Sequence, residues 1–344
     1  MGTSGGYDAF RIISDMRVAL LLTESVFDSG LSIVCDVLDT ANSLRCELQR
    51  PPPPWEITLV GFGRLHRTAR GHRVRTEAPA SVAPDVVVVP AVGVKEPTQL
   101  VGLVESPVQR RAIEFVSAVA ADGVVVAGAC TGTFFLAEAG VLDGRQATTS
   151  WWLGPAFRER YPRVDLDTRA TLVHDAEVAT AGAAFAHIDL ALWLVRRRSP
   201  ALAELVARYL LIGDRASQAA FALPSVLAVQ CPQTAAFERW VRAHLGEELS
   251  ICKAAAAIGL SERTLQRRTL ATMGLSPLAF VNEIRLDEAS HLLRSTSLSA
   301  DAVAAAVGFR NASSLGQLAR RRRGCTVRAL RGVTSRVSEI VSDV

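Results

Sequence analysis

The chain has 344 residues, 49% of them hydrophobic, which makes it too apolar for a disordered protein and too long for one compact core. Its formal net charge of +4 is uneven: residues 236–344 hold 16 basic and 10 acidic side chains, a net charge of +6, and the remainder carries −2. Because only Lys95 and Lys253 are lysines, the basic region is rich in arginine, the side chain suited to phosphates and base edges.

The six cysteines form no CxxC pair and do not cluster with histidines, so we expect neither a metal site nor a cofactor. Free cysteines are typical of a reduced intracellular compartment. The first ten residues lack the charge and apolar run of a signal peptide, and no apolar run is long enough to span a membrane. We therefore predict a cytoplasmic protein that does not associate with membranes.

Residues 1–15 are predicted to form a flexible tail, and residues 16–213 to form an α/β domain. Short β-branched runs alternate there with helical patterns, which predicts a parallel sheet covered by helices on both faces. The expected strands lie at residues 18–22, 57–60, 85–89 and 123–126. The expected helices lie before Asn42, near 108–121, after Cys130, and at 189–197 and 201–211.

The segment around Cys130 predicts a strand, a sharp turn and a helix. Small residues surround one side chain in the sequence VVVAGACTGTF of residues 124–134, which is typical of a nucleophile elbow with cysteine in place of serine. The N-terminus of a helix favours a thiolate and binds anions. This turn is therefore a candidate for catalysis, for ligand binding or for oxidation.

Residues 214–235 are predicted to be a linker, residues 236–334 a helical domain, and residues 335–344 a second tail. Within the helical domain, residues 250–259 recur in the same phase at residues 299–308, each copy running from a serine through an alanine-rich helix to a glycine. Serine caps a helix, and glycine supplies the left-handed turn between two helices. The repeat predicts two helix-turn-helix units, with helices at 251–258, 262–271, 301–307 and 312–323, joined by a long helix at 277–294.

Several motifs of this domain resemble the AraC family of bacterial regulators: GLSERTLQRR at 259–268, GLSP at 274–277 and AAAVGF at 304–309. The resemblance implies that Arg263, Gln266 and Arg267 contact DNA bases, and each can pair with a base edge. The alternative is that these are ordinary solvated residues of a helix.

The second unit departs from that family. Ala319 stands where an aromatic residue is usual, Thr326-Val327 where Ser-Pro is expected, and Gln317 where an arginine often reads bases. We expect the second unit to position the protein more than it specifies sequence, with contacts from Gln317, Arg320, Arg321 and Arg322, the arginines binding mainly phosphates.

The first domain resembles the PfpI-like domain of the class I glutamine amidotransferase superfamily, through LAEAGVLDGR at 136–145, ATTSW at 147–151 and IDLAL at 188–192. That resemblance implies a flavodoxin-like fold. In relatives a histidine commonly follows Ala-Thr-Thr, but Ser150 stands there. The acidic position after the first strand falls on Gly30, with Glu24 and Asp28 nearby. His174 and His187 are other candidate bases, although a lone histidine is usually structural.

Without a base the thiol is not expected to be catalytic, so we predict no enzyme. A small-molecule pocket is the preferred use of the elbow, with Cys130, Thr131, Gly132, Ser150 and Asp28 as its candidate residues. Two alternatives remain: a cysteine-dependent hydrolase or hydratase, and a redox sensor based on Cys130.

The order of the two domains is that of the GlxA-type transcription regulators. The resemblance implies a sequence-specific regulator that binds double-stranded promoter or operator DNA. A homodimer, a small-molecule effector and contact with RNA polymerase are the other partners that it suggests.

Overall fold

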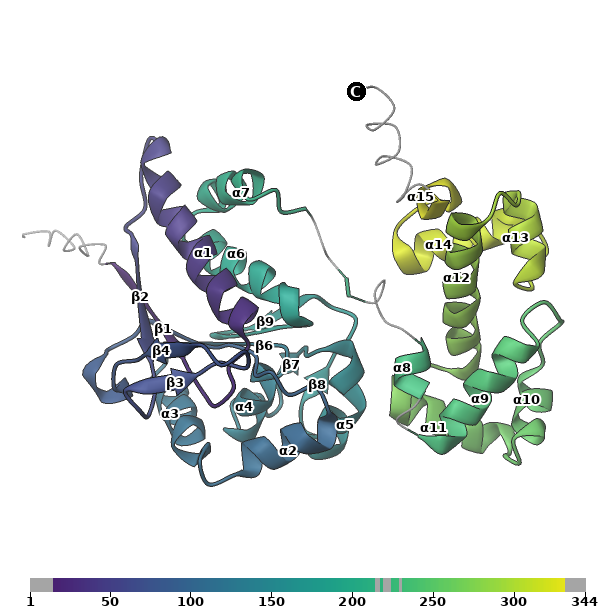
Figure 1. Cartoon of the computed structure of the whole chain (residues 1–344), viewed down its shortest axis with the longest axis horizontal. Helices are drawn as coiled ribbons and strands as arrows, with labels where there is room; N and C mark the ends of the chain where they lie inside the picture. The colour runs from purple at the N-terminus through teal and green to yellow at the C-terminus, as the bar shows by residue number, and fades with distance from the viewer. Residues whose placement is uncertain (1–14, 214–216, 219–223, 229–230, 332–344) are drawn as a thin grey trace, which may run out of the picture. The chain divides into compact units, whose positions relative to one another are not determined.

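The computed structural model describes residues 15–213, 217–218, 224–228 and 231–331 (Figure 1). The two predicted tails and much of the predicted linker therefore lie outside the described residues. The chain forms two compact units: residues 15–150 and 161–213 make up the first, and the described residues beyond 216 together with residues 151–160, which include α5 (Gly154–Arg160), make up the second. Among the described helices, none is both long and apolar enough to cross a bilayer.

The first unit is built on a six-stranded sheet in the order β2-β1-β5-β6-β10-β9. Its first five strands in that order are parallel to one another: β2 (Trp55–Val60), β1 (Met16–Leu21), β5 (Val86–Val89), β6 (Val125–Ala129) and β10 (Val178–Ala181). The central strand β5 is four consecutive valines, all buried, because both faces of the sheet are covered. The flavodoxin-like α/β fold expected from the sequence is confirmed.

Helices cover the two faces in separate layers (Figure 1). One layer consists of α1 (Asp28–Leu44), α6 (His187–Arg198) and α7 (Pro200–Tyr209), whose apolar faces share a core with the sheet. The other layer includes α2 (Pro97–Glu105), α3 (Arg110–Ala121) and α4 (Gly132–Glu138). Ser199 caps α7 by accepting a hydrogen bond from Leu202 N–H at 3.2 Å, and Pro200 occupies the first helical position.

The sheet departs from the expected all-parallel arrangement at one edge, where β9 (Leu172–Asp175) pairs antiparallel with β10. A two-residue connection joins these strands, with Ala176 at a positive φ of 52°. Neither β9 nor β10 was predicted from the sequence, and neither were four other short strands, β3 (Leu65–Arg67), β4 (Arg73–Arg75), β7 (Gln146–Ala147) and β8 (Asp165–Leu166). Strands of two to four residues are too short for a period-two pattern to stand out.

The second unit is entirely helical in its described residues. After α5 it continues with α8 (Pro224–Ala228) and α9 (Pro232–Ala243), so helices occupy part of the range expected as linker. We expected the helical domain to begin at residue 236, but α9 starts four residues earlier, with Pro232 at a first-turn position where its missing N–H costs no hydrogen bond. Five-residue α15 (Val327–Arg331) closes the unit.

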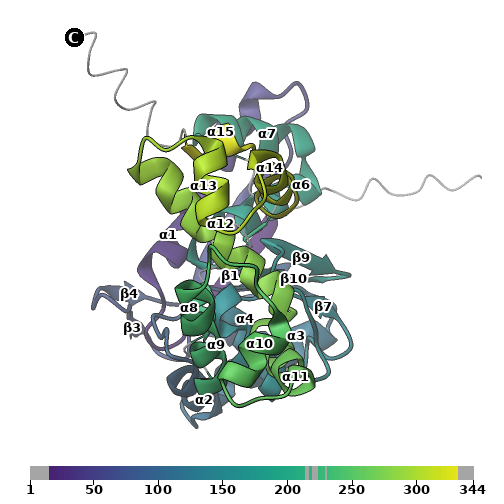
Figure 2. The same cartoon turned by 90° about the vertical axis from the view of Figure 1, so that its right-hand side faces the viewer.

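Two helix pairs lie between these ends, joined by α12 (Pro277–Ser295) (Figures 1 and 2). The first pair is α10 (Ile251–Ala257) with α11 (Glu262–Met273), and the second is α13 (Ala300–Ala306) with α14 (Ala312–Arg323). Every one of these five helices is capped by a side chain that accepts a backbone hydrogen bond, from Ser250, Ser261, Ser276, Ser299 and Asn311 in chain order.

The turn within each pair depends on a glycine, Gly259 with φ 73° and Gly308 with φ 80°. At Gly308 space is also limiting, because a Cβ atom would lie 2.3 Å from the carbonyl oxygen of Leu245. Side chains other than glycine resist both conditions. The two helix-turn-helix units predicted from the repeat are thereby formed as expected.

The two pairs have separate hydrophobic cores, and α12 contributes to both. Its first half packs Phe280, Val281 and Ile284 into the core of the first pair. Its second half packs Leu286 and Leu293 into the core of the second pair. One helix of 19 residues, about 28 Å long at about 1.5 Å per residue, therefore fixes the separation of the two pairs.

Candidate nucleic-acid interface and cysteine elbow

Helix α11, the second helix of the first pair, presents the three predicted base-reading residues to solvent. Arg263, Gln266 and Arg267 are exposed, whereas Leu265 and Thr269 on the opposite face are completely buried. Residues 263 and 267 are four apart and so share one face of the helix. The structure thus places the three side chains together, with the reach and polarity that contact with base edges requires.

Helix α14, the second helix of the other pair, divides its predicted DNA-binding residues into two groups. Gln317, Arg320 and Arg321 are exposed. Arg322 is half-buried and directed elsewhere, since its Nε lies 3.5 Å from Oε1 of Glu283 on α12. Arg322 is therefore less available for a phosphate than its place in the arginine run suggested.

Glu283 also pairs with Arg323, whose Nη2 lies 3.2 Å from its Oε2. Burial raises the pKa of Glu283, while the two arginines oppose that rise. The cluster joins α12 to the C-terminal end of α14. Sequence reasoning missed it, because nothing in the sequence distinguishes Glu283 from the other carboxylates of α12.

The missing aromatic anchor of the second unit has a structural counterpart. Ala319 is completely buried in the core of the second pair, and Gly316 on the same helix is buried beside Val327 of α15. A Cβ atom at position 316 would lie 3.4 Å from Val327 Cγ2, an ordinary packing contact. Ala319 thus fills, with a small side chain, a buried position where the family usually places a ring, whereas Gly316 is not required by close packing.

Arg285 of α12 ties the two helix pairs together. Its Nη2 donates to the carbonyl oxygens of Leu245 and Glu247, at 3.3 and 3.1 Å, in the loop that follows α9. Its guanidinium also lies 5.6 Å from the centre of the Phe309 ring, at the turn of the second pair. Arg285 therefore has a structural role in holding the second unit together.

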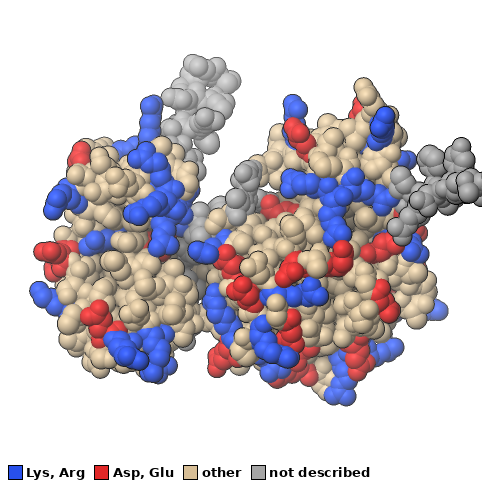
Figure 3. Space-filling view, turned by 180° about the vertical axis from the view of Figure 1, so that it is seen from behind, with Lys and Arg blue, Asp and Glu red and all other residues tan. Residues whose placement is uncertain are grey.

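The basic side chains of the second unit are not spread evenly over its surface. The face shown in Figure 3 carries them toward both ends of that unit, with mostly uncharged surface between them. A charge distribution of this kind suits a ligand with two separated segments of phosphate backbone.

The Cys130 elbow of the first unit has the geometry predicted from its sequence. Strand β6 ends at Ala129, Cys130 takes a positive φ of 57°, and α4 begins at Gly132. A non-glycine residue in this conformation stores backbone strain, as nucleophile elbows do. Gly132 is required by close approach, because a Cβ atom there would lie 2.3 Å from the carbonyl oxygen of Val89.

Ser150 faces the thiol and donates a hydrogen bond to Cys130 Sγ at 2.8 Å. Cys130 is 4% exposed and Ser150 is completely buried. Burial raises the pKa of the thiol, although hydrogen bonds from Ser150 and Thr131 act in the opposite direction. The direction of this pKa shift is opposite to the thiolate that was expected at the helix N-terminus, because burial disfavours the charged form.

Thr131 and Gly132 are equally enclosed. The hydroxyl of Thr131 accepts from Val92 N–H at 2.7 Å and donates to the carbonyl oxygen of Val92 at 3.0 Å, so its polar capacity is satisfied within the protein. Four of the five residues proposed for an elbow pocket are thus buried, and the fold engages their polar atoms.

Asp28, the fifth candidate, binds the β3–β4 hairpin. Its carboxylate accepts from Arg70 N–H at 3.0 Å and lies 2.6 Å from Nδ1 of His72. Burial would raise the pKa of Asp28, but hydrogen bonds from Thr68, His72 and Arg70 lower it. The carboxylate organises a loop.

His187 occupies the space that the acidic residue of related enzymes would need. A Cβ atom on Gly30 would lie only 2.7 Å from His187 Nε2. The ring is completely buried, accepts from Ala91 N–H at 3.1 Å, and places Nδ1 2.5 Å from the carbonyl oxygen of Ala184. Burial lowers the pKa of His187 to about 4. Both nitrogens are committed to the backbone, so His187 is a structural histidine.

His174, the other candidate base, lies on the edge strand β9. It is exposed, and its ring centre lies 5.8 Å from that of Trp193 on α6. The structure therefore gives both histidines partners other than Cys130. In the described residues no cluster of histidine, cysteine and carboxylate side chains could hold a metal ion.

Together these features define a protein with a flavodoxin-like α/β unit, a buried cysteine elbow and a double helix-turn-helix unit. The chain belongs to the DJ-1/PfpI family, which matches residues 16–197, and it carries an AraC-type helix-turn-helix domain, matched at residues 254–332.

Several known proteins are similar to this chain. The HTH-type transcriptional regulator GbdR of Pseudomonas aeruginosa is 29% identical over 298 residues, covering 85% of this chain and 77% of GbdR. CdhR, an HTH-type transcriptional regulator of the same species, is 31% identical over 196 residues, covering 56% of this chain and 58% of CdhR. A crystal structure of an AraC family transcriptional regulator from Pseudomonas putida covers 57% of this chain and 99% of its own, with 24% identity and a TM-score of 0.47.

Proposed function

We propose that the protein is a transcription regulator that binds specific double-stranded DNA through both helix-turn-helix units. The observation that carries this proposal is the pair of exposed polar helices, α11 and α14, held by the single helix α12. Recognition helices about 34 Å apart enter successive major grooves on one face of the duplex, and α12 supplies a spacing of that order. Relatives named as HTH-type transcriptional regulators support the same function, which implies action in the cytoplasm.

The first unit is proposed to sense a small molecule, to dimerise and not to catalyse. Support for the absence of catalysis comes from the elbow itself: the hydroxyl of Ser150, not a base, faces Cys130, and His187 is bonded to backbone on both sides. A cysteine nucleophile needs a base within hydrogen-bond reach. Dimerisation would present two copies of the second unit to DNA, and contact with RNA polymerase would complete an activator.

The redox-sensor alternative requires an accessible thiol of low pKa, and the structure favours the opposite in both respects. Peroxide treatment tests it directly. We expect operator binding by the wild type and by Cys130→Ala to be equally insensitive to peroxide. Loss of binding in the wild type alone would establish the sensor and displace the small-molecule proposal.

The central test selects an operator from a random DNA library with the full-length protein. Fluorescence anisotropy then measures affinity for that operator and for a scrambled duplex between 50 and 200 mM salt. We expect a preference for the operator of at least about a thousandfold and an affinity that falls steeply with salt. Equal affinity for both duplexes, or an affinity independent of salt, would contradict the proposal.

A further inference from the structure

The hairpin formed by β3 and β4 concentrates positive charge on the first unit. Residues 64–75 contain five arginines and no carboxylate, a net charge of +5. Because residues 1–235 together carry −2, the rest of that range carries −7. All five arginines are exposed: Arg64, Arg67, Arg70, Arg73 and Arg75. The hairpin is therefore a basic surface on an otherwise acidic part of the chain, and it lies at the edge of the first unit (Figure 2).

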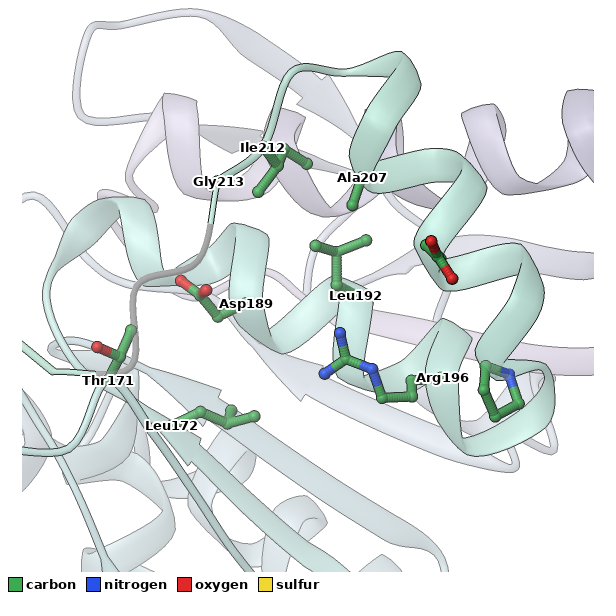
Figure 4. Close-up of a pocket in the computed structure, with 10 residues that line it drawn as sticks. Thr171, Leu172, Asp189, Leu192, Arg196, Ala207, Ile212 and Gly213 are labelled. Carbon is green, nitrogen blue, oxygen red and sulfur yellow. The ribbon is translucent and has the colours of Figure 1, made fainter.

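Elsewhere on this unit the two signs of charge are mixed. The hollow between α6 and α7, for example, is lined by Arg196 together with Asp189 and Glu204 (Figure 4). Other exposed arginines of the unit, such as Arg17 and Arg163, pair with carboxylates. In the part of the chain that the structure describes, no arginine side chain of the hairpin forms an ion pair. The positive charge of the hairpin is thus not neutralised by its own unit.

Strand pairing gathers three of these arginines on one face of the hairpin. Arg67 lies directly opposite Arg73, and Leu65 lies opposite Arg75. Since successive side chains alternate between the two faces of a strand, these four residues share the outer face. The inner face is half-buried, and its Val74 packs against the core of the unit. The outer face therefore presents three arginines and one leucine to solvent.

This arrangement is unfavourable for the protein by itself. Like charges directly opposite each other in a pair of strands are destabilising, because their Cβ atoms lie only about 5 Å apart. If the hairpin only had to remain soluble, a carboxylate at position 67 or 73 would remove the repulsion. An anion bound to the outer face would remove it as well. The outer face is therefore suited to an anionic partner.

The hairpin is also held firmly, so its arginines are presented in a fixed arrangement. Asp28 at the start of α1 accepts from Arg70 N–H at 3.0 Å and lies 2.6 Å from Nδ1 of His72. Ala69 N–H donates to the carbonyl oxygen of Val26 at 2.9 Å. Binding of a partner therefore needs little ordering of the backbone, which lowers its entropic cost.

The shape of the surface indicates the kind of anion. Sites for small molecules are concave, whereas the exposed outer face of a hairpin does not enclose a ligand. An extended polyanion gains affinity on such a surface, because each phosphate that is neutralised releases condensed counterions. Arginine forms bidentate hydrogen bonds with phosphate. Duplex DNA is the polyanion that the proposed function brings to this chain, at high effective concentration once the second unit is bound.

We propose that the arginine hairpin, residues 64–75, binds the phosphate backbone of duplex DNA beside the operator. Arg67, Arg73 and Arg75 donate to phosphate oxygens, while the second unit reads the operator itself. This inference rests on the proposed DNA-binding function. It gives the first unit a direct part in DNA binding, in addition to the proposed sensing and dimerisation.

The test compares the full-length protein with the triple variant Arg67→Gln/Arg73→Gln/Arg75→Gln. Fluorescence anisotropy measures affinity between 50 and 200 mM salt for the selected operator extended by about 20 base pairs on each side. Loss of three phosphate contacts should reduce the slope of log affinity against log salt by about 2.7, so that the wild type loses about forty times more affinity than the variant over that range. On a duplex trimmed to the operator, the two proteins should have equal slopes. An unchanged slope on the long duplex, or an equal reduction on both duplexes, would overturn the proposal.

The matched control is Arg50→Gln/Arg196→Gln/Arg208→Gln, which removes the same charge from exposed positions outside the hairpin and should leave both slopes unchanged. An equal reduction in this control would ascribe the effect to net charge and refute the contact. Thermal melting checks folding, and the hairpin variant should melt no lower than the wild type, because the repulsion between Arg67 and Arg73 is removed. If the triple variant does not fold, Arg73→Gln alone should reduce the slope by about 0.9.

Other polyanions are compared with poly-L-glutamate and polyuridylic acid as probes. If the hairpin variant loses affinity for either probe while its slope on DNA is unchanged, the surface binds an acidic protein or RNA and the proposal is wrong. Preference for the operator over a scrambled duplex is measured separately on the wild type. If that preference holds but the hairpin variant keeps the wild-type slope, only this inference fails. If the wild type shows no preference while the hairpin variant has a reduced slope, the regulator function fails and the hairpin stands as a contact to DNA of any sequence.

Discussion

The two recognition helices are expected to make separable contributions, α14 through phosphates and α11 through bases. Arg320 and Arg321 are exposed at the end of α14, unlike Arg322, which is paired with Glu283. If each exposed arginine neutralises one phosphate, replacing both by glutamine reduces the slope of log affinity against log salt by about 1.8. Over a fourfold rise in salt, the wild type should then lose about twelve times more affinity than the variant.

Fluorescence anisotropy on the selected operator between 50 and 200 mM salt measures this difference. The matched control is Arg239→Gln, which removes an exposed arginine from α9, outside both helix pairs, and should leave the slope unchanged. An unchanged slope in the α14 double variant would refute phosphate binding by these residues.

Base reading by α11 is tested on the same duplexes. Arg267→Ala should cost about 1–3 kcal/mol on the operator and relax preference at one or two base pairs. The reasoning fails if Gln317→Ala alters base preference more than Arg267→Ala does, because α14 would then be the principal reader.

Three further predictions concern the first unit. Ser150→His should lower the pKa of the Cys130 thiol in a thiol-reactivity titration. Because position 150 is fully buried, overpacking by the larger side chain should cost about 1–3 kcal/mol in the free energy of unfolding. An unchanged thiol pKa would mean that the ring does not reach the thiol. Gly30→Ala should destabilise the wild type in denaturant unfolding, since the clash with His187 exceeds the gain of about 1 kcal/mol in helix propensity. The same substitution should stabilise a His187→Ala background. A change in the free energy of unfolding with the same sign in both backgrounds would exclude the clash. His187 has a pKa of about 4 in the folded protein and about 6.5 when unfolded. Its contribution to the free energy of unfolding is therefore complete above pH 6.5 and falls by about 3 kcal/mol as the pH drops to 4. The variant His187→Gln should lack this loss when unfolding is measured across that pH range.

The fold was predictable wherever a local pattern carried it. Buried valine runs gave the central strands, and the serine and glycine positions of the repeat gave the four short helices of the two pairs. The edge strand β9 was not predictable, because its antiparallel pairing depends on a short connection at Ala176 and not on periodicity.

At the sites, sequence patterns identified exposed residues better than buried ones. The face of α11 follows from helical spacing, and the elbow conformation from its small residues. The burial of Cys130 and the commitment of His187 to the backbone depend on segments far apart in the chain.

The packing of His187 against Gly30 also constrains how this sequence can change in evolution. An acidic residue at position 30 cannot be accommodated until the imidazole moves, and the imidazole cannot be lost without leaving Ala91 N–H unbonded and a void beside α1. Either change alone is therefore deleterious to folding. To regain the catalytic residues of related enzymes, the sequence would also need a histidine at position 150. A lineage that has reached this arrangement is held there by the packing of its own core.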